Sequence, residues 1–382
     1  MLDTWTLTAL LAAGMLASLI SIRAGVTVAV IEMALGMILG TALGLKSLEH
    51  QWWLFLASFA SVTLTFMAGS ETDLGAMRSN LMKTILFGLI SFLSPFMGGL
   101  LFSHLVLGWD LSASLIVGVA LSSTSVAIVY VVLVEGGLAH TDVGKFILSG
   151  CFFTGLATLS ALSLLFISAS FMLLLFLAAM VTAALFLPIV LRELHARIRG
   201  RSGDIEVKAI LLSVFLLAAM GELVGVQAVL PAYILGLISS STLSQMRDAV
   251  GKLKSITLVF LNPFFFLGAG SNVSLLAMAS GVMIIVALFL VKVGFKFIGV
   301  YPLAKRYVGT SAPFVTLLMA TGLTFGTIAA QSGLSYGLLT IDQYSILIAA
   351  ILMSAIIPTL LASHWLPSKK KINSEGTATV DR

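Results

Sequence analysis

Two clusters of hydroxyl-bearing and glycine residues lie in the middle of apolar stretches, where they could bind an ion. The first cluster consists of Ser122, Ser123, Thr124 and Ser125, and the second of Thr321, Gly322, Thr324, Gly326 and Thr327. Such residues allow a membrane helix to unwind, and the freed carbonyls and half-helix ends can then point at an ion. A single cluster more often serves close helix packing. Because the two clusters occupy equivalent places in a repeated pattern, we predict a crossed pair of broken helices.

A lysine within an apolar stretch is the second candidate for chemistry. Lys292 lies inside the stretch 277–300, and a lysine at the bilayer centre costs on the order of 3 kcal/mol on insertion scales. Three interpretations stay open: Lys292 is an uncharged amine, it pairs with an acid elsewhere in the chain, or it takes up and releases a proton. We expect Lys296, one turn further along, to extend its amine to the cytoplasmic membrane surface.

Three acidic residues lie at or near membrane depth. Glu32 is the deepest, and we expect a structural role facing the protein interior, although an intramembrane acid is also a functional candidate. Glu71 and Glu222 lie near the ends of apolar stretches. We therefore expect both to anchor the ends of membrane spans or to line an entrance.

The elements that carry these residues are predicted to be membrane helices. Only 10% of the residues are charged, 59% are hydrophobic, and the mean hydropathy is +1.12. Thirteen apolar stretches run from Leu7 to Trp365, and a bilayer core requires roughly 20 apolar residues per helix. Because the backbone must satisfy its own hydrogen bonds in lipid, we predict an all-α polytopic membrane protein with thirteen transmembrane helices.

Basic residues gather in every second connection between the apolar stretches, whereas the other connections contain only Lys46. This bias predicts an N-terminus outside and a C-terminus in the cytoplasm, with residues 368–382 as a short basic cytoplasmic tail. The net charge of +5 reflects this topology, so we expect the lipid bilayer with its anionic headgroups, and not nucleic acid, as the partner. With a single cysteine, Cys151, and no nucleophile–base set, metal cluster or phosphate loop, we expect neither an enzyme nor a bound cofactor.

The chain resembles itself at an offset of about 200 residues. The segments Ala68–Leu74 and Ala269–Leu275 match, and the two hydroxyl clusters follow each of them in the same order. An odd number of spans separates the copies, so they must lie in the membrane with opposite orientation. Inverted repeats of this kind, here two of five helices each, are an architecture of secondary transporters. The glycines Gly36, Gly40 and Gly44 share one helix face and predict a packing seam.

Several segments together resemble sodium/proton antiporters of the second cation:proton antiporter family, the NapA-like group. They are Phe66–Glu71, Ser123–Ala127, Ile31–Gly36, Leu230–Leu237 and Met319–Thr327. The resemblance implies an exchanger-type transmembrane domain over residues 1–367. It implies core-domain helices at about 82–168 and 277–366 that move against dimer-domain helices at about 5–69 and 171–271, within a homodimer. We expect no C-terminal nucleotide-binding domain of the kind that related potassium efflux systems carry.

One position departs from the family pattern. In these antiporters an Asp binds sodium and protons in competition. In this chain Thr154 matches the residue before that Asp, but Gly155 stands at the position of the Asp itself. Oxygens remain that could coordinate sodium weakly, on Ser122, Thr124, Ser125, Thr154, Thr321 and Thr324. Hydroxyls cannot exchange a proton near neutral pH. By the resemblance, Lys292 lies close to this site.

Two functions stay open at this point. The first is exchange of a monovalent cation (Na⁺, with Li⁺ or K⁺ as alternatives) for protons across a bacterial or archaeal inner membrane, with Na⁺ and H⁺ as cargo. The second is a transport-impaired homologue that acts as a sensor, a leak or a subunit of a heteromer, because the ion-binding carboxylate is missing at Gly155.

Overall fold

The computed structural model describes residues 4–24, 26–71, 81–138, 141–167, 171–198 and 204–364. These residues form helices joined by short connections, so the predicted all-α membrane fold is confirmed. Nine helices in the described part are long and apolar enough to cross a membrane, and Val28–Ala42 and Val229–Leu243 are shorter apolar helices. The count of thirteen spans stays a prediction. The predicted basic tail, 368–382, lies outside the described residues.

The chain divides into two compact units. Unit 1 comprises Met1–Leu74 and Leu159–Ser271, and unit 2 comprises Gly75–Thr158 and Asn272–Arg382. The helices of unit 1 are α1 (Thr4–Ala24), α2 (Val28–Ala42), α3 (Gln51–Ser70), α9 (Phe171–Ile198), α10 (Asp204–Glu222), α11 (Val229–Leu243), α12 (Arg247–Ser255) and α13 (Asn262–Ser271). The roles of core and dimer domain, predicted from the resemblance, stay predictions.

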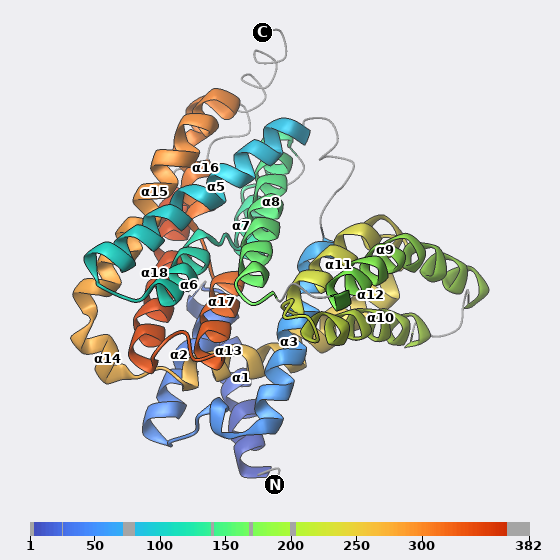
Figure 1. Cartoon of the computed structure of the whole chain (residues 1–382), viewed down its shortest axis with the longest axis horizontal. Helices are drawn as coiled ribbons and strands as arrows, with labels where there is room; N and C mark the ends of the chain where they lie inside the picture. Colours follow the sequence, from blue (N-terminus) through green and yellow to red (C-terminus); the bar gives the residue numbers. More distant parts are fainter. Residues whose placement is uncertain are drawn as a thin grey trace. The chain divides into compact units, whose positions relative to one another are not determined.

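The helices of unit 2 are α5 (Leu81–Leu101), α6 (Leu111–Ser122), α7 (Val126–Glu135), α8 (Asp142–Leu164, with its last turns in unit 1), α14 (Leu275–Ser280), α15 (Val282–Val308), α16 (Ala312–Ala320), α17 (Thr324–Ser335) and α18 (Ile341–His364). Figure 1 shows α6 beside α17, with α15 and α18 next to them. Asp110 caps α6 by accepting hydrogen bonds from the backbone N–H groups of Ser112 and Ala113. Buried apolar side chains from α5, α7, α8, α15 and α16 form one continuous core in this unit.

Two close helix crossings in unit 1 depend on glycine. Helix α2 packs on α13, and a Cβ added to Gly36 or Gly270 would overlap a backbone carbonyl oxygen of the other helix. Helix α3 packs on α11 in the same manner, through Gly69 and Gly236. Gly236 follows Gly36 by about 200 residues, and Gly270 follows Gly69 by about 200 residues. The predicted repeat thus relates α2 to α11 and α3 to α13. Each crossing pairs one helix of the first copy with one helix of the second, and the repeat converts one crossing into the other, as a two-fold relation between the copies requires.

The glycine seam predicted on α2 extends over two of its three residues. Gly36 and Gly40 both face the backbone of α13, but no atom lies within 4 Å of a Cβ added to Gly44. Gly44 has a φ of +67°, because it lies just beyond the end of α2, where the chain turns in the left-handed region that favours glycine. The prediction was therefore wrong for Gly44, whose role is to end the helix.

We expect Gly36→Ala to destabilise the protein by about 1–3 kcal/mol, the usual cost of overpacking a tight contact, because the new methyl group meets the Leu267 carbonyl. Gly251→Ala is the matched control, since no atom lies within 4 Å of its added Cβ. Thermal unfolding of the detergent-solubilised protein, followed by loss of the monodisperse chromatographic peak, measures both. Equal unfolding temperatures for the two variants would contradict the assigned seam.

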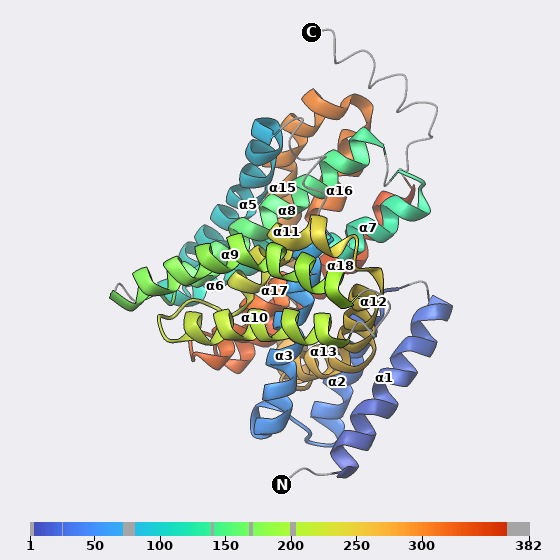
Figure 2. The same ribbon diagram turned by 90° about the vertical axis from the view of Figure 1, so that its right-hand side faces the viewer.

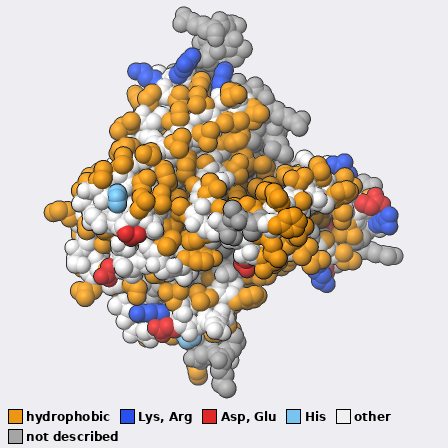
Figure 3. Space-filling model, in the orientation of Figure 1, with side chains coloured by type: hydrophobic (Ala, Val, Ile, Leu, Met, Phe, Trp, Pro, Cys, Tyr) orange, Lys and Arg blue, Asp and Glu red, His pale blue; other side chains and the backbone are white. Residues whose placement is uncertain are grey.

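Helices α9 and α10 lie side by side in both views of the molecule, Figure 1 and Figure 2. His195 Nδ1 on α9 lies 2.7 Å from Glu206 Oε1 on α10, which joins their polar ends. Much of α9 is exposed and apolar. Figure 3 shows hydrophobic side chains over much of the visible face of the molecule. A large exposed apolar surface is what the hydrocarbon of a bilayer covers. The chain is therefore an integral membrane protein.

Candidate functional site

The two hydroxyl clusters form the breaks of two discontinuous helices, as predicted. Helix α6 ends at Ser122 and α7 begins at Val126, while α16 ends at Ala320 and α17 begins at Thr324. The breaks touch each other: the Ser125 backbone N–H donates to the Thr321 carbonyl at 2.9 Å. Next to this bond, the Thr124 hydroxyl donates to the Met319 carbonyl at 2.7 Å. The crossing therefore lies wholly within unit 2.

The hydroxyl groups at the breaks satisfy the carbonyls that unwinding leaves free. Ser122, Ser123 and Thr321 each donate to the carbonyl three residues earlier, at 2.7 Å in all three cases. The last carbonyls of a helix have no partner within the helix, and a buried one must find another donor. Because these hydroxyl hydrogens are used in this way, the oxygen lone pairs stay free to accept from a donor or to coordinate a cation.

Lys296 lies in the centre of the crossing. Its side chain is fully buried, and Nζ donates to Ser91 Oγ at 2.8 Å and to Thr124 Oγ1 at 2.9 Å. The expectation that Lys296 extends to the membrane surface was therefore wrong. The physical reason is helix geometry: residues four apart share a face, so Lys296 points inward with Lys292. The Lys296 amine connects α5, α15 and the break between α6 and α7.

Lys292 is also fully buried, and its Nζ has no hydrogen-bond partner among the described residues. A Cβ added to Gly322 would overlap Lys292 Nζ and would lie 2.7 Å from the carbonyl oxygen of Ser123. The Lys292 amine therefore lies at the point where the two breaks meet. The described acids with buried side chains are Glu32 and Glu206, both in unit 1. The interpretation that pairs Lys292 with an acid thus finds no support in the described part of unit 2.

Helix α8 presents one polar face to the crossing. Cys151 Sγ lies 3.5 Å from Met319 Sδ, and Thr158 Oγ1 lies 3.5 Å from Ser122 Oγ. Gly155 is buried and lies between these two contacts on the same face, four residues after the first and three before the second. The neighbouring Thr154 hydroxyl bonds the carbonyls of Gly150 and Gly88. A side chain at position 155 would therefore point to the crossing.

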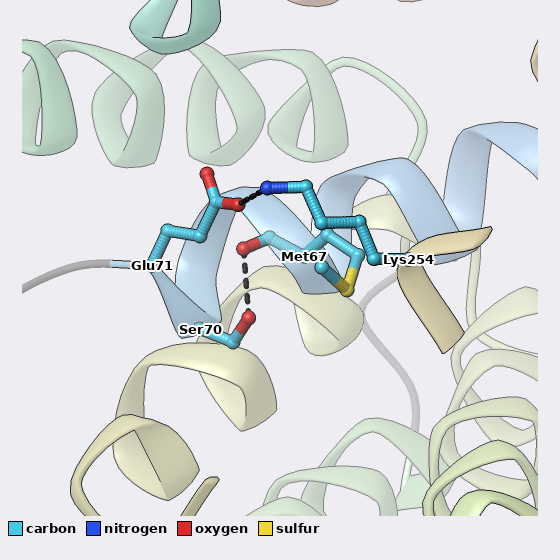
Figure 4. A network of polar contacts seen from close by, with 4 residues as sticks. All are labelled: Met67, Ser70, Glu71 and Lys254. Carbon is cyan, nitrogen blue, oxygen red and sulfur yellow. Dashed lines mark hydrogen bonds and ion pairs between the residues drawn. The ribbon is translucent and has the colours of Figure 1, made fainter. Parts of the chain in front are cut away.

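The remaining candidates form none of the contacts described above. Thr324 is half-buried and begins α17. Glu32 is buried in unit 1 and accepts a hydrogen bond from Asn262 Nδ2 at 3.1 Å, which agrees with the expected structural role. Glu71, at the end of α3, forms an ion pair with Lys254 Nζ at 2.9 Å, as Figure 4 shows. Glu222, at the end of α10, is exposed.

We expect Glu71→Gln to change the unfolding free energy by less than about 1 kcal/mol, because the ion pair is solvent-exposed and salt screens it. Lys254→Gln should have an effect of the same size, and the double variant should equal either single one within error. Unfolding temperatures of the three proteins at low and high salt measure this. A loss several times larger would show that the pair holds α3 to α12.

Sequence reasoning missed Ser91, Lys296 as a buried group, and Ser354, whose hydroxyl donates to the Gly322 carbonyl at 3.1 Å. The i, i+4 spacing of the two lysines was a usable signal for Lys296. Isolated serines in apolar helices gave no such signal, because their partners lie on helices far away in the sequence.

An all-α membrane protein with two broken helices that cross inside one unit has the architecture of a secondary transporter. A family model described as "Sodium/hydrogen exchanger, transmembrane" matches residues 7–366, and the chain belongs to this family. The family is one of transporters, not enzymes.

Similar proteins extend over most of the chain. It is 26% identical to the Na(+)/H(+)-K(+) antiporter GerN of Bacillus cereus, over 93% of this chain and 94% of that protein. It is 27% identical to the probable Na(+)/H(+) antiporter 3 of Methanocaldococcus jannaschii, over 88% and 90%. The fold is similar to that of the sodium proton antiporter MjNhaP1 from M. jannaschii at pH 8, with a TM-score of 0.72, 14% identity, and coverage of 95% and 96%.

Proposed function

We propose that this protein exchanges a monovalent cation, Na⁺ with Li⁺ or K⁺ as alternatives, for protons by alternating access. Membership in the sodium/hydrogen exchanger family supports the proposal, as do the antiporters to which the chain is similar along nearly its whole length. The expected setting is a bacterial or archaeal inner membrane, with the N-terminus outside and the C-terminus in the cytoplasm. Na⁺ and H⁺ are the cargo, and no cofactor takes part.

The crossing of the two breaks is the observation that carries this proposal. The oxygens of Ser122, Thr124, Ser125, Thr154 and Thr321 are the proposed cation ligands, with Thr324 at the margin. The hydroxyls of Ser122, Thr124, Thr154 and Thr321 already donate their hydrogens to carbonyls, so a cation can approach their lone pairs. Gly155 contributes no ligand other than its backbone.

We assign the coupling of cation movement to proton movement to the two lysines, Lys292 and Lys296. A cation at Thr124 would lie next to the Lys296 amine, which bonds the same oxygen at 2.9 Å. A cation and an ammonium so close repel each other strongly in a medium of low dielectric constant. The site therefore holds either the cation with uncharged amines or the protonated lysines without the cation. This exclusion gives exchange without an acid, with Lys292 and Lys296 as the proton carriers.

The test is a sodium pulse on the protein reconstituted in liposomes that contain a pH-sensitive dye. Outward proton movement above that of empty liposomes is expected, with KCl and LiCl as parallel arms. If none of the three cations moves protons, the proposal is overturned, and the transport-impaired homologue, a sensor, leak or heteromer subunit, takes its place.

We further propose that unit 2 carries the ion during the conformational change and that unit 1 forms the interface of a homodimer. The resemblance to the antiporter family is the support for both. Native mass spectrometry of the detergent-released protein is expected to give the mass of two chains. A purely monomeric spectrum, with exchange intact in liposomes at one chain per vesicle, would contradict the dimer.

A further inference from the structure

The charges buried in unit 2 are unbalanced. Its buried charged side chains in the described residues are Lys292 and Lys296, four residues apart on one face of α15. No carboxylate among the described residues of this unit is buried with them. Removing a charge from water costs several kcal/mol unless a partner compensates it. Whenever these lysines are protonated, the described residues around the crossing therefore provide no buried negative charge to balance them.

Lys292 has unused hydrogen-bond donors at this point. An ammonium group has three N–H donors, and Lys292 Nζ makes no hydrogen bond among the described residues, although its side chain is 0% exposed. The buried hydroxyl of Thr327 on α17 also has no hydrogen-bond partner there. Unused donors in a buried place are unfavourable and call for an acceptor.

The helix ends at the crossing add partial positive charge. Helices α7 and α17 both begin at the breaks, and neither N-cap residue, Ser125 or Leu323, makes a side-chain capping bond. The first N–H groups of a helix have no partner in the helix, and its N-terminus favours negative charge. Gly322, beside the Lys292 amine, immediately precedes the N-cap of α17.

By the resemblance to the antiporter family, position 155 is where a fixed negative charge is missing. Gly155 lies on the α8 face that contacts Met319 and Ser122 on either side of it, and it offers no side-chain acceptor. We propose that a small monovalent anion of the size of chloride binds at the crossing, beside Lys292 and the N-terminus of α17. The anion accepts from the Lys292 ammonium and supplies the charge that no buried side chain of the described unit provides.

Binding of this anion is measured separately from the proposed exchange, on the protein at rest. Radiolabelled chloride is added to the purified full-length protein in detergent and gluconate buffer, without transportable cations. We expect saturable chloride binding that bromide displaces and that gluconate does not displace. We expect Lys292→Met to weaken chloride binding about tenfold or more, since it removes the charged partner.

Two further variants test whether misfolding, and not the loss of the charged partner, weakens chloride binding in Lys292→Met. Gly155→Asp should also weaken chloride binding about tenfold, because its own carboxylate pairs the ammonium, whereas the neutral Gly155→Asn should bind chloride more tightly than Gly155→Asp does. Gly294→Ala is the inert control, since no atom lies within 4 Å of its added Cβ.

Absence of saturable chloride binding to the unaltered protein overturns the anion site. So does binding that Lys292→Met leaves unchanged. Chloride binding without cation-driven proton movement would refute the proposed exchange alone, and exchange without chloride binding would refute the anion site alone.

Discussion

Gly155→Asp is expected to raise sodium-driven proton movement in liposomes about tenfold or more, equivalent to about 1.4 kcal/mol of the barrier. Position 155 faces the crossing between the Cys151 and Thr158 contacts, so a carboxylate there joins the hydroxyl oxygens around the cation. A carboxylate binds a hard cation more strongly than hydroxyls do, and it also takes up a proton when the cation leaves. Both effects strengthen the competition on which exchange depends.

Gly155→Asn separates the two possible causes of such a gain. Its side chain has nearly the volume of Asp and an oxygen ligand but no charge and no proton to exchange. We expect Gly155→Asn to move protons no faster than the unaltered protein in the same assay. Equal rates for the Asp and Asn variants would show that the added oxygen, and not the charge, changed transport.

Lys296→Met is expected to reduce sodium-driven proton movement to below about a tenth of the rate of the unaltered protein. The amine bonds Ser91 and Thr124, and Thr124 in turn donates to Met319, so the substitution removes both a proton carrier and the group that orders the first break. Methionine fills a similar volume without a buried charge. Replacing a buried ion by an apolar side chain of similar size is often neutral or stabilising.

The unfolding temperature therefore distinguishes a functional role of Lys296 from a structural one. We expect Lys296→Met to unfold at or above the temperature of the unaltered protein while transport is lost. Lys305→Met, on the same helix but exposed, is the control and should keep normal exchange. A Lys296→Met protein that unfolds early would reveal that the amine chiefly holds α5 and the first break together.

The broken helices could be predicted because their signal is local. Hydroxyls and glycines in the middle of an apolar stretch conflict with a continuous membrane helix, and the conflict recurs at an offset of about 200 residues. The structure adds the contact itself, the bond between Ser125 and Thr321, which joins residues from opposite halves of the chain.

Lys296 and Gly44 show where local reasoning failed. A lysine one turn from the end of the predicted apolar stretch 277–300 can reach the surface or point inward. Only the packing of Ser91 and Thr124 around it decides between the two. Gly44 shares the four-residue spacing of the seam, but α2 ends at Ala42, before the spacing can place it against α13.

The sequence by itself determined the class of fold and the membrane setting, predicted the repeat, and showed that glycine, not an acid, stands at position 155. Each of these depends on composition, spacing or one residue type, which the chain carries without folding. The tertiary structure decided which groups share the site: two buried lysines, the Ser91 and Thr124 hydroxyls, and a glycine beside an unpaired amine. The physical reason is that burial, and with it the cost of an unpaired charge, arises only when helices distant in the sequence pack together.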